Sequence, residues 1–168
     1  MADIEMNQNN DLALLMDRYG NMVLRLAVAN LGNMADAQDV CQEVFMKLHR
    51  ARNPFHHAEH EKAWIIRVTM NTCRDVLRSP WRRWFSPVAE VPIPYDQAVS
   101  VDVVALVLSL PRKYRTVIHL YYYEGYKTYE KAPLLDMKEA TIRTQLKRAR
   151  ELLKAKLEGG MEENVVEI

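Results

Sequence analysis

The chain has 168 residues, a length that suits one medium domain or two small ones. Apolar residues make up 49% of it and charged residues 27%, and no stretch approaches the ~20 consecutive apolar residues of a membrane-spanning helix, which argues against a membrane-embedded protein. The formal net charge of +1 at pH 7 argues against indiscriminate binding to nucleic acid.

The first residues and the cysteines indicate a cytoplasmic protein without a metal framework. Residues 1–11, MADIEMNQNND, lack the basic and apolar regions of a signal peptide, so we expect the protein to stay in the cytoplasm. Cys41 and Cys73 are too few and too far apart for a zinc framework, and each falls at an apolar helical position. Buried, reduced thiols are therefore favoured over a functional pair.

Helical periodicity dominates the chain and predicts an all-α fold of two small helical domains. The pattern predicts helices over residues 11–31, 34–50, 59–79, 97–109, 111–124, 128–135 and 137–158. Gly32 and Asn33 separate the first two, and the interval 79–94 contains four of the seven prolines, which cannot continue a helix. We therefore expect a three-helix domain over 11–79, a Pro-rich linker over 80–96, a four-helix domain over 97–158 and a disordered acidic tail over 159–168.

Two of the predicted helices place a basic stripe beside their apolar stripe. In the third helix the apolar stripe is Ala63, Ile66, Met70, Cys73 and Leu77, and the neighbouring stripe is Arg67, Asn71, Arg74 and Arg78. In the last helix the apolar stripe is Ile142, Leu146, Ala149 and Leu153, and the basic one is Arg143, Lys147, Arg150 and Lys154. Surface helices usually mix Glu with Lys at i, i+4 spacing, whereas these stripes contain no acid. This pattern favours nucleic acid as the partner over a face that is only solvated.

The two helices at 128–135 and 137–158, with a short turn between them, have the spacing of a helix-turn-helix. In that motif the second helix enters the major groove and its first residues contact bases. The side chains that would face the groove are Glu139, Ala140, Thr141, Arg143 and Thr144, and those nearer phosphates would be Lys147, Arg148 and Arg150. Any helical hairpin can imitate this spacing, so the motif alone leaves the partner open.

Four segments, in order, resemble one family. They are DAQDVCQEVFMKLHR at 36–50, AWIIRVTMNTCRDVLR at 63–78, LPRKYRTVIHLYYYEGY at 110–126 and ATIRTQLKRARELLK at 140–154. Together they resemble the extracytoplasmic-function (ECF) sigma factors, the promoter-specificity subunits of bacterial RNA polymerase, over about residues 12–157. The resemblance implies a sigma-2-like N-terminal domain, a sigma-4-like C-terminal domain, and a role in transcription initiation, often in a stress response.

The resemblance assigns the helix over 34–50 to core RNA polymerase. The residues that match the family's polymerase-binding motif, with one neighbour, are Asp36, Asp39, Gln42, Glu43, Phe45 and Met46. From the periodicity alone, Val40, Val44 and Leu48 look like core, which leaves Asp39, Glu43 and Met46 on an adjacent face. Asp36 and Asp39 could instead cap the helix and interact with its dipole.

The resemblance also assigns the next helix and the loop before it to the −10 promoter element as it melts. Trp64, Asn71, Asp75 and Arg78 match the family's pattern. The predicted contacts, which offer polar edges, rings and cations to single-stranded DNA, are Asn53, Phe55, His56, His57, Arg67, Asn71, Arg74 and Arg78. Trp64 is favoured as a core or domain-edge anchor over a stacking platform for a base.

Neither a metal nor a cofactor is expected. The run HHAEHE at 56–61 is rich in possible ligands, but Trp64 stands where an H-E-x-x-H zinc helix needs its second histidine. The chain has no Gly-rich phosphate loop, no nucleophile paired with a base and no paired carboxylates, so we do not expect an enzyme. In the linker Trp81, Trp84 and Phe85 either fold back on a domain or, as the family implies, insert into the polymerase.

The helix over 128–135 departs from the family pattern at three positions. Lys131 replaces an isoleucine or valine, Pro133 a common glutamate, and Asp136 a glycine. We expect Lys131 to lie on the face that packs between helices, where an ammonium must reach water or lose its charge. With Thr128 as the N-cap, Pro133 would remove about one backbone hydrogen bond, and Asp136 would either adopt a left-handed turn or cap the next helix in a D-x-x-E box with Glu139.

Two other classes of protein remain as alternatives. A stand-alone helix-turn-helix regulator should dimerise and bind duplex DNA unaided, and a helical metal enzyme or small-molecule module should have a polar pocket. The partners implied by the family are core RNA polymerase, promoter DNA and an anti-sigma factor that is usually associated with the membrane. The residues alone support the nucleic-acid partner.

Overall fold

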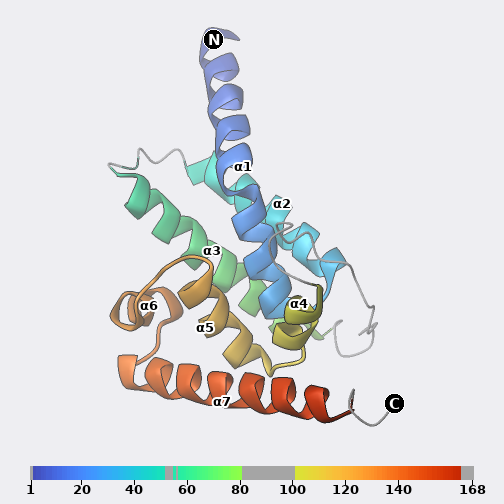
Figure 1. Cartoon of the computed structure of the whole chain (residues 1–168). Helices are drawn as coiled ribbons and strands as arrows, with labels where there is room; N and C mark the ends of the chain where they lie inside the picture. Colours follow the sequence, from blue (N-terminus) through green and yellow to red (C-terminus); the bar gives the residue numbers. More distant parts are fainter. Residues whose placement is uncertain (1, 52–54, 56, 81–100, 164–168) are drawn as a thin grey trace. The chain divides into compact units, whose positions relative to one another are not determined.

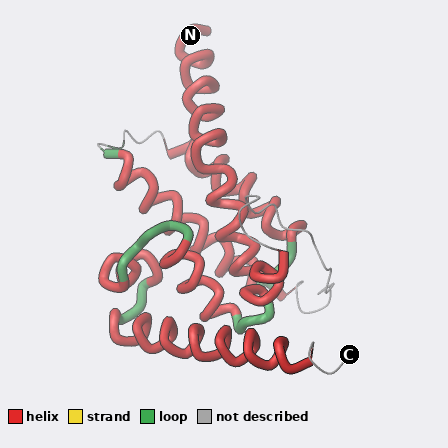
Figure 2. The backbone as a smooth tube through the Cα atoms, viewed as in Figure 1, coloured by secondary structure: helices red, strands yellow, loops and turns green. Residues whose placement is uncertain are grey.

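The computed structural model describes residues 2–51, 55, 57–80 and 101–163, and every element in these ranges is a helix (Figures 1 and 2). The helices are α1 (Ala2–Leu31), α2 (Met34–Ala51), α3 (Ala58–Arg78), α4 (Val101–Leu108), α5 (Arg112–Tyr122), α6 (Thr128–Leu135) and α7 (Glu139–Glu163). The chain divides into two compact units, residues 1–93 and 94–168. The all-α prediction is confirmed, and the division falls inside the predicted linker, whose aromatic residues Trp81, Trp84 and Phe85 lie outside the described residues.

The first unit is a bundle in which α1, α2 and α3 pack against one another (Figure 1). Its fully buried side chains come from all three helices, and they include Val23, Leu26, Val40, Val44, Ile65, Ile66 and Cys73. Gly32 has φ 77°, which only glycine adopts at little cost, and its N–H donates to the Val28 carbonyl at 2.8 Å. This left-handed residue ends α1 and allows α2 to fold back on it.

Two predictions about this unit were wrong in detail. Helix α1 begins at Ala2, nine residues before the predicted start. The buried face of α3 is centred on Ile65, Ile66, Thr69, Thr72 and Cys73, whereas Ala63, Met70 and Leu77 are only half-buried. The two threonines can be buried because their hydroxyls donate to the carbonyls of Ile65 and Val68, each at 2.8 Å.

The cysteines are free thiols. Cys73 is buried, as predicted, and Cys41 is half-buried.

The second unit packs α5 and α6 against the long helix α7, with α4 against α5 and α7. Its buried core is made by the apolar sides of α5, α6 and α7, together with one residue from the turn before α5: Leu110, Val117, Leu120, Leu134, Leu135, Ile142, Leu146 and Ala149. Gly125, with φ 69°, lies in the turn after α5, where the N–H of Tyr126 donates to the Leu120 carbonyl at 3.0 Å. The left-handed Gly125 thus follows the end of α5 and allows the chain to turn towards α6.

Helix α7 differs from its prediction at both ends. It begins at Glu139 instead of 137, and it continues through Gly159 and Gly160 to Glu163, so the first half of the predicted disordered tail is helical. Glycine lowers helix stability by ~1 kcal/mol without preventing the backbone hydrogen bonds, so the helix can extend past both. Residues 164–168 lie outside the described part.

No helix in the described ranges combines the length and the apolar character needed to cross a membrane.

Candidate DNA-binding and protein-binding faces

The predicted helix-turn-helix is present, with α6 and α7 joined by a tight turn. Asp136 ends α6 in the left-handed conformation, φ 53° and ψ 48°, and the N–H of Met137 donates to the Ala132 carbonyl at 3.1 Å. The alternative, an Asp136–Glu139 capping box, does not form. The Glu139 carboxylate instead accepts hydrogen bonds from the Thr128 hydroxyl at 3.1 Å and from Arg143 at 2.7 Å. This carboxylate therefore links the first turns of both helices.

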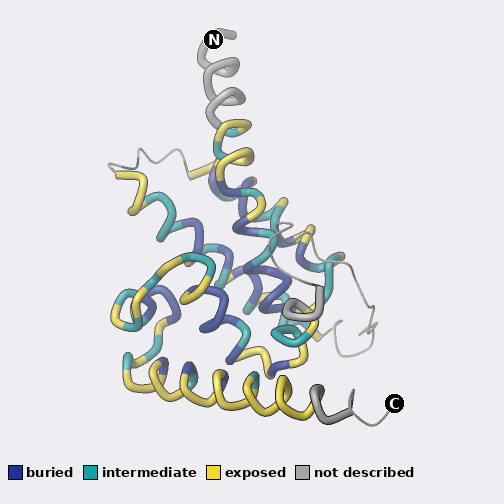
Figure 3. Tube along the Cα trace, viewed as in Figure 1, coloured by how far each residue is buried: buried dark blue, intermediate teal, exposed yellow. Residues whose placement is uncertain are grey.

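The outer side of α7 offers its polar residues to solvent (Figure 3). Of the eight predicted −35 contacts, Ala140, Thr141, Arg143, Thr144, Lys147, Arg148 and Arg150 are exposed and Glu139 is half-buried. Ile142, Leu146 and Ala149 face the core, each 3% exposed or less. The predicted division of this helix into a core face and an exposed polar face is therefore present, with Leu153 half-buried at the edge of the core face.

The basic stripe of α7 is less isolated from acids than its sequence indicated. Arg143 pairs with Glu139, Lys147 lies 4.0 Å from Glu151, and Lys154 lies 3.7 Å from Glu158. The acidic partners lie four residues before or after each cation, outside the stripe itself, so the stripe alone did not reveal them. Exposed pairs of this kind contribute only ~0.2–1 kcal/mol, so a phosphate can compete for the same cations.

Arg150 is held by two tyrosines of α5. Its Nε donates to the Tyr122 hydroxyl at 3.0 Å, and its guanidinium carbon lies 5.1 Å from the Tyr121 ring centroid. Cation–π contacts at exposed positions contribute ~0.5–1 kcal/mol. Arg150 therefore attaches α7 to α5, in addition to any contact it makes with DNA.

Lys131 lies beneath this cluster, and the prediction that it packs between helices is confirmed. It is 0% exposed, its Nζ has no hydrogen-bond partner, and that atom lies 4.4 Å from the Tyr121 ring centroid. Burial lowers the pKa of Lys131 to about 8, with nearby Arg150 acting in the same direction and Glu130 opposing it. Folding therefore disfavours the charged form of Lys131.

The N-cap of α6 differs from the prediction, since Lys127 is the N-cap and Thr128 is the first helical residue. The Glu130 carboxylate accepts the backbone N–H of Lys127 at 2.6 Å, which satisfies one of the free amides at this end. Pro133 is exposed and lies inside the helix, later than the first turn. The helix tolerates it close to its C-terminal end.

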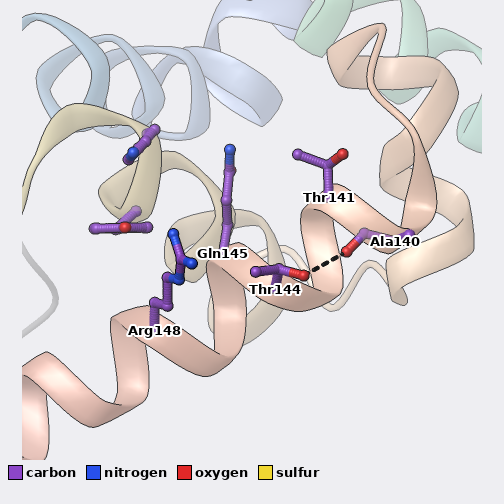
Figure 4. Close-up of a pocket in the computed structure, with 7 residues that line it drawn as sticks. Ala140, Thr141, Thr144, Gln145 and Arg148 are labelled. Carbon is purple, nitrogen blue, oxygen red and sulfur yellow. Dashed lines mark hydrogen bonds between the residues drawn. The ribbon is translucent and has the colours of Figure 1, made fainter.

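A cleft of about 370 Å³ separates the start of α5 from the first turns of α7 (Figure 4). It is lined by Lys113, Tyr114, Ala140, Thr141, Thr144, Gln145 and Arg148. In Figure 4 the side chains of Gln145 and Arg148 project from α7 into this space. Lys113, Tyr114 and Gln145 were not predicted to belong to a site, because the first two lie far along the chain from the third. The basic pair at 112–113 was the only sequence signal.

In the first unit, α2 presents most of the residues predicted to bind the polymerase. Asp39, Gln42 and Met46 are exposed, and Asp36 and Glu43 are half-buried. Phe45 is 3% exposed and belongs to the core of the unit, because it follows the buried Val44 on the inner side of the helix. Phe45 can thus support this face but cannot itself be reached by a partner.

Asp36 also has a local structural role. Its backbone N–H donates to the Asn33 side-chain oxygen at 2.8 Å, and its carboxylate accepts from the Asn33 amide at 2.8 Å. These contacts make Asn33 the cap of α2, whereas Asp36 lies in the first turn, where its carboxylate can interact with the helix dipole as the alternative expected. Asp39, one turn further, remains exposed on the outer face.

Helix α3 carries the predicted −10 stripe on its accessible side. Arg67, Asn71 and Arg78 are exposed and Arg74 is half-buried. Within the described ranges none of these arginines forms an ion pair with an acid; Arg74 lies 3.5 Å from the Asn71 side-chain oxygen. This stripe, unlike that of α7, matches the prediction of cations without acidic neighbours.

The loop before α3 is described only in part. Phe55 is half-buried, with its ring 5.5 Å from Trp64 and 6.2 Å from His60. Trp64 is half-buried beside Phe55, as expected of an anchor at the domain edge. His57 is exposed, and Asn53 and His56 lie outside the described residues. No group of three possible metal ligands comes together among the residues that the structure covers.

Both units match known families. Residues 15–83 match sigma-70 region 2, and residues 100–153 match sigma-70 region 4; together the matches span more than two thirds of the chain. The ECF RNA polymerase sigma factor SigW of Bacillus subtilis is 25% identical over 176 residues, which cover 94% of each chain. The probable RNA polymerase sigma factor RfaY of Xanthomonas campestris is 29% identical over 82% of this chain, which spans only 38% of that relative.

Two solved structures share the fold. The sigma factor RpoE of Bartonella quintana, solved with the anti-sigma factor NepR, has a TM-score of 0.68 at 22% identity, covering 89% of this chain and 96% of that one. CnrH, solved with the cytosolic domain of CnrY, has a TM-score of 0.58 at 24% identity, covering 90% of each chain. At these identities the likeness establishes the fold.

Proposed function

The chain belongs to the sigma-70 family, in its ECF group, and on this basis we propose that it is an alternative sigma factor, which binds core RNA polymerase and directs it to a particular set of promoters. The observation that carries the proposal is the occurrence of regions 2 and 4 in one chain, each in its own helical unit. A stand-alone helix-turn-helix regulator would have no use for region 2, so that alternative is disfavoured.

We assign the −35 element to α7. Its exposed Thr141, Arg143 and Thr144 lie in the first turns, where a helix in the major groove contacts base edges. Lys147 and Arg148, which are also exposed, follow further along the helix and would lie nearer the phosphates. Glu139 holds the Arg143 guanidinium at 2.7 Å, which limits its rotamers before DNA binds and so reduces the entropy lost on binding.

We assign the melted −10 element to α3 and the loop before it. Arg67, Arg74 and Arg78 supply cations for a backbone, and Asn71 between them can donate to and accept from a base edge. The remaining predicted contacts of this group are Asn53, Phe55, His56 and His57. We assign the outer face of α2, with Asp39, Gln42, Glu43 and Met46, to a basic surface of core polymerase.

Regulation and location follow from the same assignment. The two solved relatives are each bound to a second protein, the anti-sigma factor NepR in one case and the cytosolic domain of CnrY in the other, and we extend binding by an anti-sigma factor to the present chain. Its association with a membrane is an expectation from the family. The protein would act in the cytoplasm, beside the polymerase, and would lend specificity to that enzyme without catalysing a reaction.

The proposal is tested by capture of purified core polymerase on the immobilised protein, with two charge-reversal variants. Asp39→Arg should reduce capture more than tenfold, since like charges oppose each other across the interface. Glu59→Arg reverses an exposed acid of α3 outside the assigned face and should bind like the parent. A parent that captures no polymerase would contradict the proposed function. Equal capture by both variants would remove only the assignment of α2.

A further inference from the structure

The cleft between α5 and α7 combines positive charge from two helices. Lys113 lies at the start of α5 and Arg148 in the third turn of α7. Both are exposed and both line the cleft. The other lining residues with polar side chains are Tyr114, Thr141, Thr144 and Gln145. None of the lining residues is an acid. The cleft is therefore suited to an anion.

The first turn of α5 strengthens this preference. Its N-cap is Pro111, which has no side-chain hydrogen bond to offer, and its first turn contains no acidic residue. The N–H groups of Tyr114 and Arg115 both turn back to the Pro111 carbonyl, at 2.9 and 3.2 Å. Arg112 and Lys113 add two exposed cations at the positive end of the helix, an arrangement that costs helix stability unless an anion is near.

Positive charge is crowded at this end of the helix in another way. Burial, and then the neighbouring Arg112, lowers the pKa of Arg115, whose side chain donates to the Leu108 carbonyl at 3.2 Å. The Nζ of Lys113 lies 5.0 Å from the ring centroid of the buried Tyr114. The Tyr114 ring thus restricts the position of Lys113, one of the two cations that line the cleft.

We propose that this cleft holds one phosphate of the DNA backbone beside the −35 element, bound between Lys113 and Arg148. The inference rests on the proposed function, and it adds a residue, Lys113, from outside the recognition helix. A phosphodiester fits better than a base, because a lysine is a point charge that favours phosphate and the cleft is open to solvent. Thr141 and Thr144 line the same cleft and belong to the reading face of α7.

The consequence of this geometry is a fixed register for α7. A phosphate bound from α5 and α7 together would fix how far the recognition helix enters the groove and how it is rotated there. Phosphate contacts position a protein on the duplex and carry no sequence information directly. Lys113 is therefore a positioning residue for the reading of bases by its neighbours.

The experiment measures binding of promoter fragments by polymerase reconstituted with the full chain, over a series of salt concentrations. Lys113→Ala should weaken binding about tenfold, as expected for a charge-assisted hydrogen bond. The loss should be the same for every −35 sequence, and the slope of log K against log salt should become less steep by ~0.9, the value for one phosphate. Lys156→Ala removes an exposed lysine of α7 far from the cleft and serves as the control.

A second arm locates the phosphate. Neutral methylphosphonates are placed one at a time beside the −35 element. At one position they should weaken binding of the parent clearly more than that of Lys113→Ala, which keeps only the contact with Arg148. Equal binding by Lys113→Ala and Lys156→Ala, or a loss that depends on the −35 bases, would overturn the proposal. A third outcome would also overturn it. If inorganic phosphate at constant ionic strength weakens promoter binding through Lys113, but no methylphosphonate position on the DNA is sensitive, the cleft is a site for free phosphate. A parent enzyme that binds no promoter would contradict the proposed function itself.

Discussion

Replacing the buried Lys131 by isoleucine should stabilise the second unit. The lysine is 0% exposed and its Nζ has no hydrogen-bond partner, so the charged form loses its hydration on folding. The neighbouring charges partly cancel, because Glu130 favours the ammonium and Arg150 disfavours it. The cation–π contact of Nζ with the Tyr121 ring, at 4.4 Å from its centroid, offsets part of this loss of hydration free energy.

The size of the effect follows from the pKa shift. Lowering the pKa of Lys131 from 10.5 to about 8 corresponds to roughly 3 kcal/mol, at 1.36 kcal/mol for each unit. Because the unfolded chain binds the proton more tightly, this penalty is complete below pH 8 and disappears as the pH rises towards 10.5. After allowance for the contact with Tyr121, Lys131→Ile should raise the free energy of unfolding by ~1–3 kcal/mol at pH 7.

The assay is hydrogen exchange of the α6 and α7 amides in the full chain, at pH 7 and at several values up to pH 9.5. All three tryptophans lie at or before residue 84, so tryptophan fluorescence would report on the first unit instead. The advantage of Lys131→Ile over the parent should shrink as the pH rises. Lys138→Ile, at an exposed position, should change stability by less than ~0.5 kcal/mol. A Lys131→Ile variant less stable than the parent at pH 7, or a difference in stability that is independent of pH, would show that the buried ammonium does not destabilise the second unit.

Three further substitutions test individual contacts in the second unit. Gly125→Ala should destabilise it by ~1–2 kcal/mol through the backbone alone, since φ is +69° and an added Cβ would meet nothing within 4 Å; an unchanged melting temperature would contradict this. Asp136→Gly should stabilise it by ~0.5–1 kcal/mol by relieving the left-handed residue, as measured by thermal melting; a lower melting temperature would mean that the aspartate side chain compensates for its backbone. Arg150→Met should cost ~1 kcal/mol of stability in the absence of DNA, because the bond to Tyr122 is lost; a variant that melts like the parent would restrict Arg150 to contacts with DNA.

The helices were predictable because the apolar periodicity and the glycine signals agree. Gly32 and Gly125 have positive φ where the sequence predicted helix ends, and α6 has the predicted bounds. The errors in helix length occur at helix ends that extend beyond the buried core. The first residues of α1 and the end of α7 carry no apolar stripe that would reveal a helix, so the sequence indicated loop or tail.

The accessible faces were predictable from the same periodicity, but the contacts within them were not. The predicted apolar stripe of α3 was displaced, because Thr69 and Thr72 can be buried once their hydroxyls bond to the preceding turn. The packing of Arg150 on Tyr122 and the position of Lys113 opposite Arg148 join segments that are separated by 28 and 35 positions in the chain. No spacing rule within one helix can reveal such pairs.

The central claim is tested most directly by run-off transcription with purified core polymerase on a library of promoter fragments. We expect the protein, added to core enzyme, to produce transcripts from a subset of fragments that share −35 and −10 sequences, and core enzyme alone to produce none of them. Core enzyme that gives the same transcripts with and without the protein would contradict its assignment as a sigma factor.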